Sequence, residues 1–408
     1  MKKIVLYQLI IFSLVVFAYL TVASGFTWTF NQSNYPYFNY LANSFLKRSW
    51  TIINPPAFRY DLSQHQGNVY LYWGPVPAIV IMPMMIIFGQ NLSDFSYTAL
   101  FGAINVFLMS LLITKFSSLV KNKLSNKDII LLTLFFAFGT VNFAVSVVGR
   151  VWFTSQVISL TPFLISLILL VEFLSSKKPF SFIISFLFLL AAAGGKLTYL
   201  LYIPMHIYSL FLNGFSIKKI SHYLTTLFLL TCLFLSVYGF YNYKRFNNPL
   251  ETGYNYQTEN SEFAYLREKY GRYNFHYLTT NIKYQLLNPL GLDSHFPFIR
   301  PNLKGNGLFI TSPLFLFIFW KVRKTFKNKY CRLLILGVLP VFLQLMLFYG
   351  TGASQFGARY LLDLIPILIL IISMQIKSIP PRIKLLFLIP SLIFCSLGAI
   401  WFSVYRQW

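Results

Sequence analysis

The chain has 408 residues, of which 56% are hydrophobic and 11% are charged, whereas roughly a quarter of the residues in a soluble domain are charged. This composition excludes an ordinary soluble protein, and apolar runs of roughly 15–22 residues exclude a transmembrane β-barrel, whose strands need only about ten. The net charge of +24 does not indicate a nucleic-acid partner, because most of the cations lie in short loops between apolar runs, where they orient membrane helices.

The N-terminal segment begins with Lys2 and Lys3, continues as an apolar run and ends in Val22-Ala23-Ser24. A cleaved signal peptide has the same order of features, but its apolar region is shorter, at roughly 7–15 residues. We therefore predict an uncleaved first transmembrane span, with the N-terminus in the cytoplasm.

The first polar stretch, residues 24–96, contains a loop at 60–75 with an unusual set of side chains. Asp61 carries the only carboxylate between the N-terminus and Asp94, and His65, several amides and several aromatic rings follow it. A long polar loop with one acid is costly in so apolar a protein unless it lines an aqueous site. We therefore expect the rest of the chain to hold this loop over a substrate.

The apolar runs predict the membrane topology. They occur at 4–23, 76–90, 97–118, 129–147, 157–175, 180–194, 197–214, 222–243, 306–320, 332–350, 359–376 and 384–404. The loops richest in Lys and Arg belong in the cytoplasm by the positive-inside rule. The Lys- and Arg-rich loops all fall on the cytoplasmic side only if one of the apolar runs does not cross the membrane. The run at 76–90 is the candidate, because it is short and contains Pro77 and Pro83. We predict 76–90 as an interfacial or re-entrant outer helix, which leaves about eleven transmembrane helices in an all-α, polytopic protein.

This topology places two long loops, 24–96 and 244–305, on the extracytoplasmic side, together with most of the acidic residues. Apolar residues at 275, 278, 282 and 286 have the spacing of a second surface-lying amphipathic helix. No long repeat or low-complexity tract divides the chain. We therefore predict one integral membrane domain over residues 1–408, with its active face and C-terminus outside.

Four phrases of the sequence carry a resemblance to a known family. They are YDLS at 60–63 together with YWGPVPA at 72–78, NYKRFNNPLETGY at 242–254, GLFITSP at 307–313 and GARYLLDLIP at 357–366. In their order and spacing, and over most of its length, the chain resembles multi-spanning glycosyltransferases of the GT-C superfamily, relatives of the dolichyl- or polyprenyl-phosphate-sugar mannosyltransferases. Membership would imply inverting transfer of a sugar from a polyprenyl-phosphate donor at the outer face, to a lipid, glycan or protein acceptor.

One departure from that family concerns the catalytic acid. Such enzymes usually carry an acidic pair or an Asp-x-Asp-like motif just after the first span, where this chain has no acid at 30–35. Inverting transfer needs a carboxylate that takes the proton of the acceptor hydroxyl. Either Asp61 is this base, or the chain binds without catalysing, or Asp61 merely bonds to the backbone or to Arg59. His65 could orient the acceptor or Asp61, or be solvated.

A phosphate leaving group needs fixed positive charge, and a guanidinium can bind it through two parallel hydrogen bonds. The candidate cations at predicted outer span ends or in the second outer loop are Arg150, Lys196, Arg245, Arg300, Lys304 and Arg359. Lys196 follows two glycines between apolar runs, where a bare charge is costly without an anion or water. Arg359 could instead pair with Asp363 one helical turn later. Glu251 could contact the acceptor or only shape a turn.

The function expected from these observations is a membrane glycosyltransferase, with membrane lipids and a polyprenyl-phosphate-linked sugar as partners. Two alternatives stay open. A transporter or flippase of lipid-linked sugars would share the basic groups, although its spans typically show inverted repeats and buried ionisable groups. A non-catalytic GT-C-like subunit would have kept the fold and lost the acid. No cofactor is assigned. A divalent metal is the remaining option, but hard cations need several oxygen ligands and Asp61 stands alone in its loop.

Overall fold

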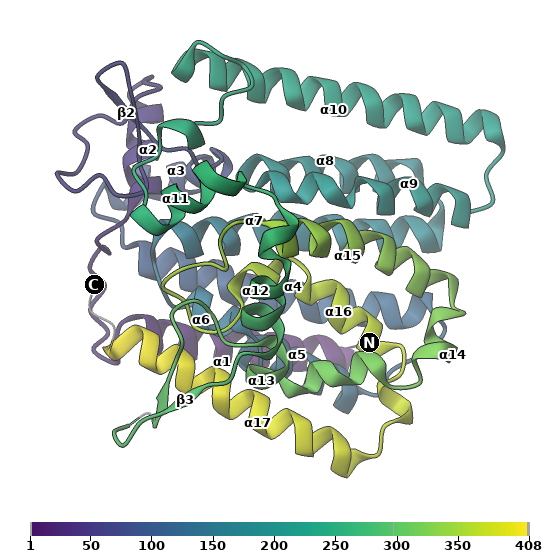
Figure 1. The fold of residues 1–408 in the computed structure, drawn as a ribbon. Coiled ribbons are helices and arrows are strands. Elements are labelled where there is room, and N and C mark those ends of the chain that lie inside the picture. The colour runs from purple at the N-terminus through teal and green to yellow at the C-terminus, as the bar shows by residue number, and fades with distance from the viewer. Residues whose placement is uncertain (1, 297, 406–408) are drawn as a thin grey trace.

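The computed structural model describes residues 2–296 and 298–405, and its ribbon is almost entirely helical (Figure 1). In this described part of the chain, six helices are long and apolar enough to cross a membrane. They are α1 (Lys2–Ala23), α4 (Asp94–Leu119), α7 (Val151–Ser176), α10 (Ile217–Phe246), α15 (Lys329–Leu347) and α17 (Pro381–Ile400). The prediction of an all-α, multi-pass membrane protein is confirmed, whereas the count of about eleven spans is not.

Shorter elements fill the rest of the bundle. Three apolar helical stretches are α3 (Val76–Phe88), α8 (Pro179–Gly195) and the continuous turn and helix Leu197–Leu212, which contains α9 (Ile203–Leu212). The other α-helices are α2 (Tyr37–Leu46), α5 (Asn126–Phe138), α6 (Val141–Ser146), α11 (Ser261–Tyr270), α12 (Leu278–Ile282), α13 (Leu308–Thr311), α14 (Val322–Phe326) and α16 (Ile365–Ser373). Short 3-10 or π turns lie at Leu197–Tyr202, Tyr254–Tyr256, Phe275–Tyr277, Lys283–Leu287, Pro313–Phe319, Arg359–Asp363, Ile376–Ser378 and Trp401–Tyr405.

The few strands form two small antiparallel hairpins in the polar loops. In the first, β1 (Ser63–His65) pairs with β2 (Asn68–Tyr70). Its turn residues Gln66 and Gly67 both have positive φ, as a two-residue turn requires to match the strand twist. The second hairpin pairs β3 (Gly291–Leu292) with β4 (Ile299–Arg300).

Local signals in the sequence set the ends of the long helices. Ser93 and Ser216 cap the starts of α4 and α10 by accepting hydrogen bonds from backbone N–H groups. The 30-residue helix α10 ends at Asn247, which adopts the left-handed conformation two residues before Pro249. These caps position the C-terminal end of α10 directly before the second polar loop, residues 244–305.

The polar loops gather at one end of the bundle. Figure 1 shows β2, α2 and α11 together at the left, while α14 and the turn before α10 lie at the right. The Lys- and Arg-rich stretch around α14 is therefore separated from the loops that carry the candidate site by the length of the bundle.

Two hydrophobic clusters hold this arrangement. The large cluster joins α1, α4 to α9, α15 and the C-terminal helices, and the smaller one packs α2 and α3 against the start of α4 and of α7. Helix α3 has 13 residues and is thus about 20 Å long, less than the roughly 30 Å of a hydrocarbon core. It exposes Ile86, Ile87 and Phe88 at its end. This geometry agrees with an interfacial α3, which stays a prediction.

The second predicted amphipathic helix exists, but it consists of three helical pieces between Phe275 and Leu287. Leu278, Ile282 and Leu286 pack against the large cluster, while Phe275 is exposed. The fully buried side of the stretch is polar: Asn281 donates hydrogen bonds to the carbonyl oxygens of Met346 and Phe348. The stretch is therefore packed on the bundle beside the end of α15.

Candidate functional site

Asp61 lies in the first polar loop, two residues before the start of β1. Only 6% of the residue is exposed, and its backbone has a φ of +59°, a left-handed conformation that Asp adopts more readily than most residues. Its N–H donates to the Thr258 carbonyl oxygen, and the Thr258 N–H donates to the Leu62 carbonyl oxygen. The two long polar loops, predicted to be the outer loops, are thus joined by backbone hydrogen bonds at the candidate base.

Three neutral side chains donate hydrogen bonds to the Asp61 carboxylate. Trp152 Nε1 lies 2.6 Å from Oδ2, while Gln257 Nε2 and the Tyr72 hydroxyl lie 2.6 and 3.2 Å from Oδ1. Burial raises the pKa of the Asp61 carboxyl, and these hydrogen bonds and the charge of Arg359 offset part of the rise. A carboxyl with a raised pKa is a better proton acceptor near neutral pH than an ordinary surface aspartate.

The loop that carries Asp61 lies against the end of α8 through glycine contacts. A Cβ added to Gly74 would lie 2.2 Å from the Gly194 carbonyl oxygen and 2.8 Å from that of Gly195, so the two backbones approach as closely as only glycine allows. Lys196 follows directly. This contact brings the first outer loop and the lysine of the α8–α9 turn to one place.

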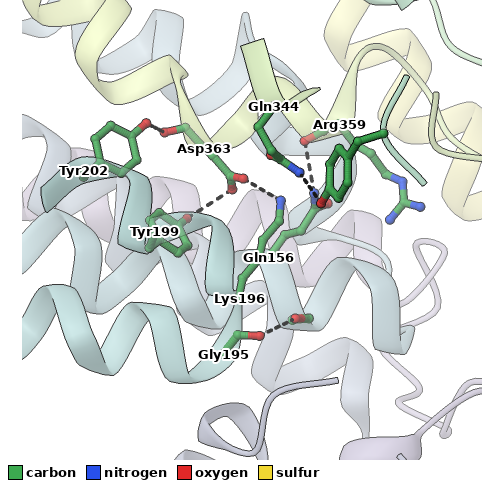
Figure 2. A network of polar contacts seen from close by, with 10 residues as sticks. Gln156, Gly195, Lys196, Tyr199, Tyr202, Gln344, Arg359 and Asp363 are labelled. Carbon is green, nitrogen blue, oxygen red and sulfur yellow. Dashed lines mark hydrogen bonds and ion pairs between the residues drawn. The ribbon is translucent and has the colours of Figure 1, made fainter. Parts of the chain in front are cut away.

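Lys196 does not stand free. Its Nζ lies 2.5 Å from Asp363 Oδ2, and the Tyr199 hydroxyl lies 3.2 Å from Oδ1 of the same carboxylate. The Tyr202 hydroxyl donates to the Asp363 backbone carbonyl (Figure 2). The alternative in which Asp363 pairs with Arg359 is therefore wrong: the carboxylate pairs with a lysine from another helix.

Arg359 is directed the other way. Figure 2 shows its guanidinium pointing away from Asp363, while its backbone carbonyl accepts a hydrogen bond from Gln156. The residue is 4% exposed, and its Nε and Nη1 have no hydrogen-bond partner. The guanidinium lies 4.7 Å from the ring centre of Tyr360 and 5.3 Å from that of Phe153. A buried guanidinium with unused donors is a strong candidate for binding an anion.

A cavity of about 330 Å³ lies over these groups. Its charged lining residues are Asp61, Arg150, Glu259 and Arg359, and its walls are aromatic. Arg150 is 8% exposed and its Nε has no hydrogen-bond partner. Burial lowers the pKa of Arg150, although a guanidinium stays protonated in proteins.

A second cavity of about 410 Å³ adjoins the first. The aromatic residues that line both cavities are Tyr72, Trp73, Tyr254, Phe348 and Tyr360. Lys196 and Arg272 line the second cavity together with the apolar side chains Leu201 and Leu345. This second cavity lies between α15 and Tyr238 of α10, and α10 exposes large apolar side chains along most of its length.

Five other predicted residues line neither cavity. One of them, Lys304, is exposed and forms an ion pair with Glu262 at 2.6 Å. Arg245 donates to the Leu71 carbonyl oxygen and to Asn242, and it stacks 3.8 Å from the Tyr241 ring centre. Glu251 accepts hydrogen bonds from the Gly253 N–H and from Asn255.

His65 packs 4.4 Å from the ring centre of Tyr256, and Arg300 is exposed in β4. Arg245 and Glu251 thus hold the outer loops in place, and their predicted contacts with substrate have no support from this geometry.

Several cavity residues were not singled out in the sequence. Trp152 and Gln257, which bond to Asp61, belong to α7 and to the second outer loop. Glu259 is a second carboxylate of the first cavity and pairs with Arg267 at 2.7 Å, although the two atoms are not aligned for a hydrogen bond. Only the position of Glu259 in an outer loop was a signal. Among the described residues, no group of three or more His, Cys, Asp or Glu side chains could hold a metal ion.

Comparison with known proteins identifies the fold. No protein-family model and no curated protein matches the chain. Among solved structures it is similar to ArnT from Cupriavidus metallidurans bound to undecaprenyl phosphate, with a TM-score of 0.52, 12% identity and coverage of 94% of this chain and 62% of that one.

It is also similar to the Archaeoglobus fulgidus oligosaccharyltransferase. The apo form has a TM-score of 0.56 at 12% identity, covering 98% of this chain and 56% of that one. The form tethered to an acceptor peptide with the NVT sequon has a TM-score of 0.54 at 12% identity, and the match covers 98% of this chain and 55% of that one. This chain thus spans little more than half the length of the solved chains. The predicted resemblance is confirmed at the level of the fold, which this chain shares with ArnT and with this oligosaccharyltransferase.

Proposed function

We propose that the protein is a membrane glycosyltransferase that transfers a sugar from a polyprenyl-phosphate donor to an acceptor hydroxyl with inversion. The observation that carries this proposal is the buried Asp61 carboxylate, which lacks an ion pair among the described residues and shares a cavity with the unpartnered guanidinium of Arg359. Inverting transfer needs these two groups together: a base for the acceptor proton and a fixed cation for the phosphate that leaves.

The second cavity suits the donor lipid. Its apolar side chains and its position between α10 and α15 offer a route for a prenyl chain from the hydrocarbon core. Lys196 lies in this cavity and Arg359 in the first, at 5.5 and 4.7 Å from the Tyr360 ring centre. A donor phosphate beside Tyr360 would bring the sugar across the shared aromatic wall towards Asp61. Undecaprenyl phosphate bound to a protein of the same fold supports a lipid of this class.

In the proposed reaction, the acceptor oxygen attacks the anomeric carbon and its proton passes to Asp61. The bond from the anomeric carbon to the phosphate oxygen breaks on the opposite face, and its electron pair leaves with polyprenyl phosphate. Trp152 and Gln257 orient the carboxylate by donating to different oxygens. Arg359 and Lys196 stabilise the negative charge that grows on the leaving phosphate.

The test is an assay that separates chemistry from transport. The purified protein is reconstituted in vesicles with undecaprenyl-phosphate-linked sugars radiolabelled in the sugar, together with membrane and cell-surface fractions as acceptors. We expect transfer of the label to an acceptor with release of undecaprenyl phosphate, and loss of both in Asp61→Asn. Movement of intact lipid between leaflets without cleavage of the sugar bond would support the flippase alternative and refute the proposal.

A further inference from the structure

Arg150 has no role in the proposed reaction, although it lines the same cavity as Asp61. It is 8% exposed and makes no ion pair among the described residues, and its Nε has no hydrogen-bond partner. The ring of Tyr35 lies beside it, with its centre 5.8 Å from the guanidinium carbon. Burying an unpaired cation is costly, so an anion that completes this site would offset that cost.

The surroundings of Arg150 favour a negatively charged sugar. Arg150 immediately precedes α7, whose 26 residues place the positive end of the helix dipole at this point. The rings of Tyr35, Phe58 and Trp152 line the same cavity, and Tyr35 contacts the other two with ring centres 6.0 and 4.8 Å away. Aromatic faces of this kind suit the apolar faces of a sugar ring.

The charge balance of the two cavities leaves one cation without a counter-charge. The charged residues that line them are the cations Arg150, Lys196, Arg272 and Arg359 and the carboxylates Asp61 and Glu259. Lys196 and Glu259 are each paired with a residue outside the lining. Within the two linings, three guanidinium groups then remain against Asp61 and the single negative charge of a donor phosphodiester, so one positive charge remains. Asp94 lies outside both linings, and its charge also acts on Arg150. Its carboxylate accepts hydrogen bonds from the Ser33 N–H and hydroxyl and makes no ion pair with Arg150 among the described residues.

We propose that the acceptor is a saccharide with an anionic group, phosphate or carboxylate, and that Arg150 binds this group. The inference rests on the proposed function, because it assigns the first cavity to the acceptor. The acceptor sugar lies among Tyr35, Phe58 and Trp152, with its anion on Arg150 and its nucleophilic hydroxyl towards Asp61. Neutral saccharides of the same shape would leave the guanidinium buried and unpaired, and they would bind more weakly.

The experiment compares three probes that differ only near one carbon of the sugar: glucose, glucose 6-phosphate and glucuronate. Their Kd values for the full-length protein in lipid nanodiscs are measured by NMR titration of the ligand signals. We expect at least one anionic sugar to bind about 10- to 100-fold more tightly than glucose, the range expected for charge-assisted hydrogen bonds. The better of the two anionic probes identifies phosphate or carboxylate as the preferred group.

Variants then assign the effect to Arg150. Arg150→Gln should abolish the preference for the anionic sugar, Arg150→Lys should keep part of it, and Arg323→Gln, an exposed arginine at the opposite end of the bundle, should keep all of it. Equal affinity of the wild type for glucose and both anionic sugars would overturn the inference without any variant, even if Arg150→Gln fails to fold. A preference that survives in folded Arg150→Gln would overturn it as well.

A separate titration with undecaprenyl phosphate distinguishes the two proposals. If the wild type binds this lipid and Arg150→Gln binds it equally well, while the anionic-sugar preference is absent from the wild type, then the acceptor inference fails and the proposed function stands. If the lipid does not bind the wild type, the proposed function fails at its donor, and the assignment of the first cavity to an acceptor falls with it.

Discussion

Asp61→Asn is the sharpest perturbation of the proposed mechanism, because the structure can accommodate the amide. The substituted side chain would keep its oxygen towards the Trp152 N–H and place its NH₂ where Oδ1 of Asp61 now accepts from Tyr72 and Gln257. The Tyr72 hydroxyl can rotate to accept instead of donate, and the Gln257 amide can turn over to present its oxygen. The change therefore removes the negative charge and the proton-accepting oxygen while preserving the shape of the site.

The expected loss of turnover is about 10²–10⁴-fold, the usual contribution of a general base, or about 3–5 kcal/mol of activation free energy. The thermal stability of Asp61→Asn, unlike its turnover, should not fall. Because burial raises the Asp61 pKa in the folded protein, the contribution of Asp61 to stability is present below the unfolded pKa and is lost as pH rises through the folded pKa. Asparagine has no charge to bury, so the melting temperature of Asp61→Asn at neutral pH should equal or exceed that of the wild type.

The assay measures single-turnover sugar transfer, undecaprenyl-phosphate binding and thermal unfolding on the same purified samples. Asp293→Asn is the matched control, because Asp293 is an exposed aspartate of the second outer loop that lines neither cavity. Equal single-turnover rates for wild type and Asp61→Asn would remove Asp61 from the mechanism. A lowered melting temperature with turnover falling only in proportion to folded protein would instead identify Asp61 as a structural carboxylate.

Four further outcomes follow from the same geometry. Arg359→Lys should weaken undecaprenyl-phosphate binding about 10-fold or more because lysine lacks the two-pronged guanidinium; unchanged affinity in a lipid titration would contradict the phosphate role. Asp363→Asn should lower the free energy of unfolding by about 3–5 kcal/mol because it removes the fully buried carboxylate that pairs with the part-buried Lys196, and thermal unfolding in detergent measures this. Transfer rates should fall as pH falls through the raised Asp61 pKa, with a midpoint above the ~3.9 of an ordinary aspartate; a pH–rate profile with no acid limb would count against a carboxylate base. A cysteine at exposed Asn91, in a background without the three native cysteines, should react with an impermeant thiol reagent from outside, whereas labelling only after permeabilisation would mean that α3 crosses the membrane.

The local sequence was sufficient for the class of fold. Composition and the length of the apolar runs predicted a helical membrane protein, since backbone groups in a bilayer must be satisfied within a helix. The short, proline-containing run at 76–90 forms a separate short helix in the structure, because its length and its prolines are local properties. Its interfacial or re-entrant position stays a prediction. The number of transmembrane spans could not be determined from local properties of the sequence. Several apolar stretches, such as α16, are too short in the structure to cross by themselves, and helix breaks depend on packing.

The pairing of charges was decided only by the tertiary structure. Spacing along the chain favoured a pair between Arg359 and Asp363, since residues four apart lie on one side of a helix. In the structure the segment Arg359–Asp363 is a 3-10 turn, which changes the relative directions of the two side chains. Lys196, which follows the end of α8, forms the ion pair with the Asp363 carboxylate. The Arg359 guanidinium lines the first cavity instead.

The difference between properties of single residues and contacts between distant residues also explains which parts of the candidate site could be predicted from the sequence. Asp61, Lys196 and Arg359 stood out because charge is rare and costly in an apolar chain, and this is a property of each residue by itself. The side chains of Trp152 and Gln257, which donate hydrogen bonds to Asp61, are uncharged and did not stand out in the sequence. They meet Asp61 only because α7 begins beside the first outer loop and the second outer loop pairs with the first through backbone hydrogen bonds. The sequence by itself therefore determined which ionisable groups had to be accounted for, whereas the tertiary structure decided which of them are paired, since pairing joins residues that are far apart in the chain.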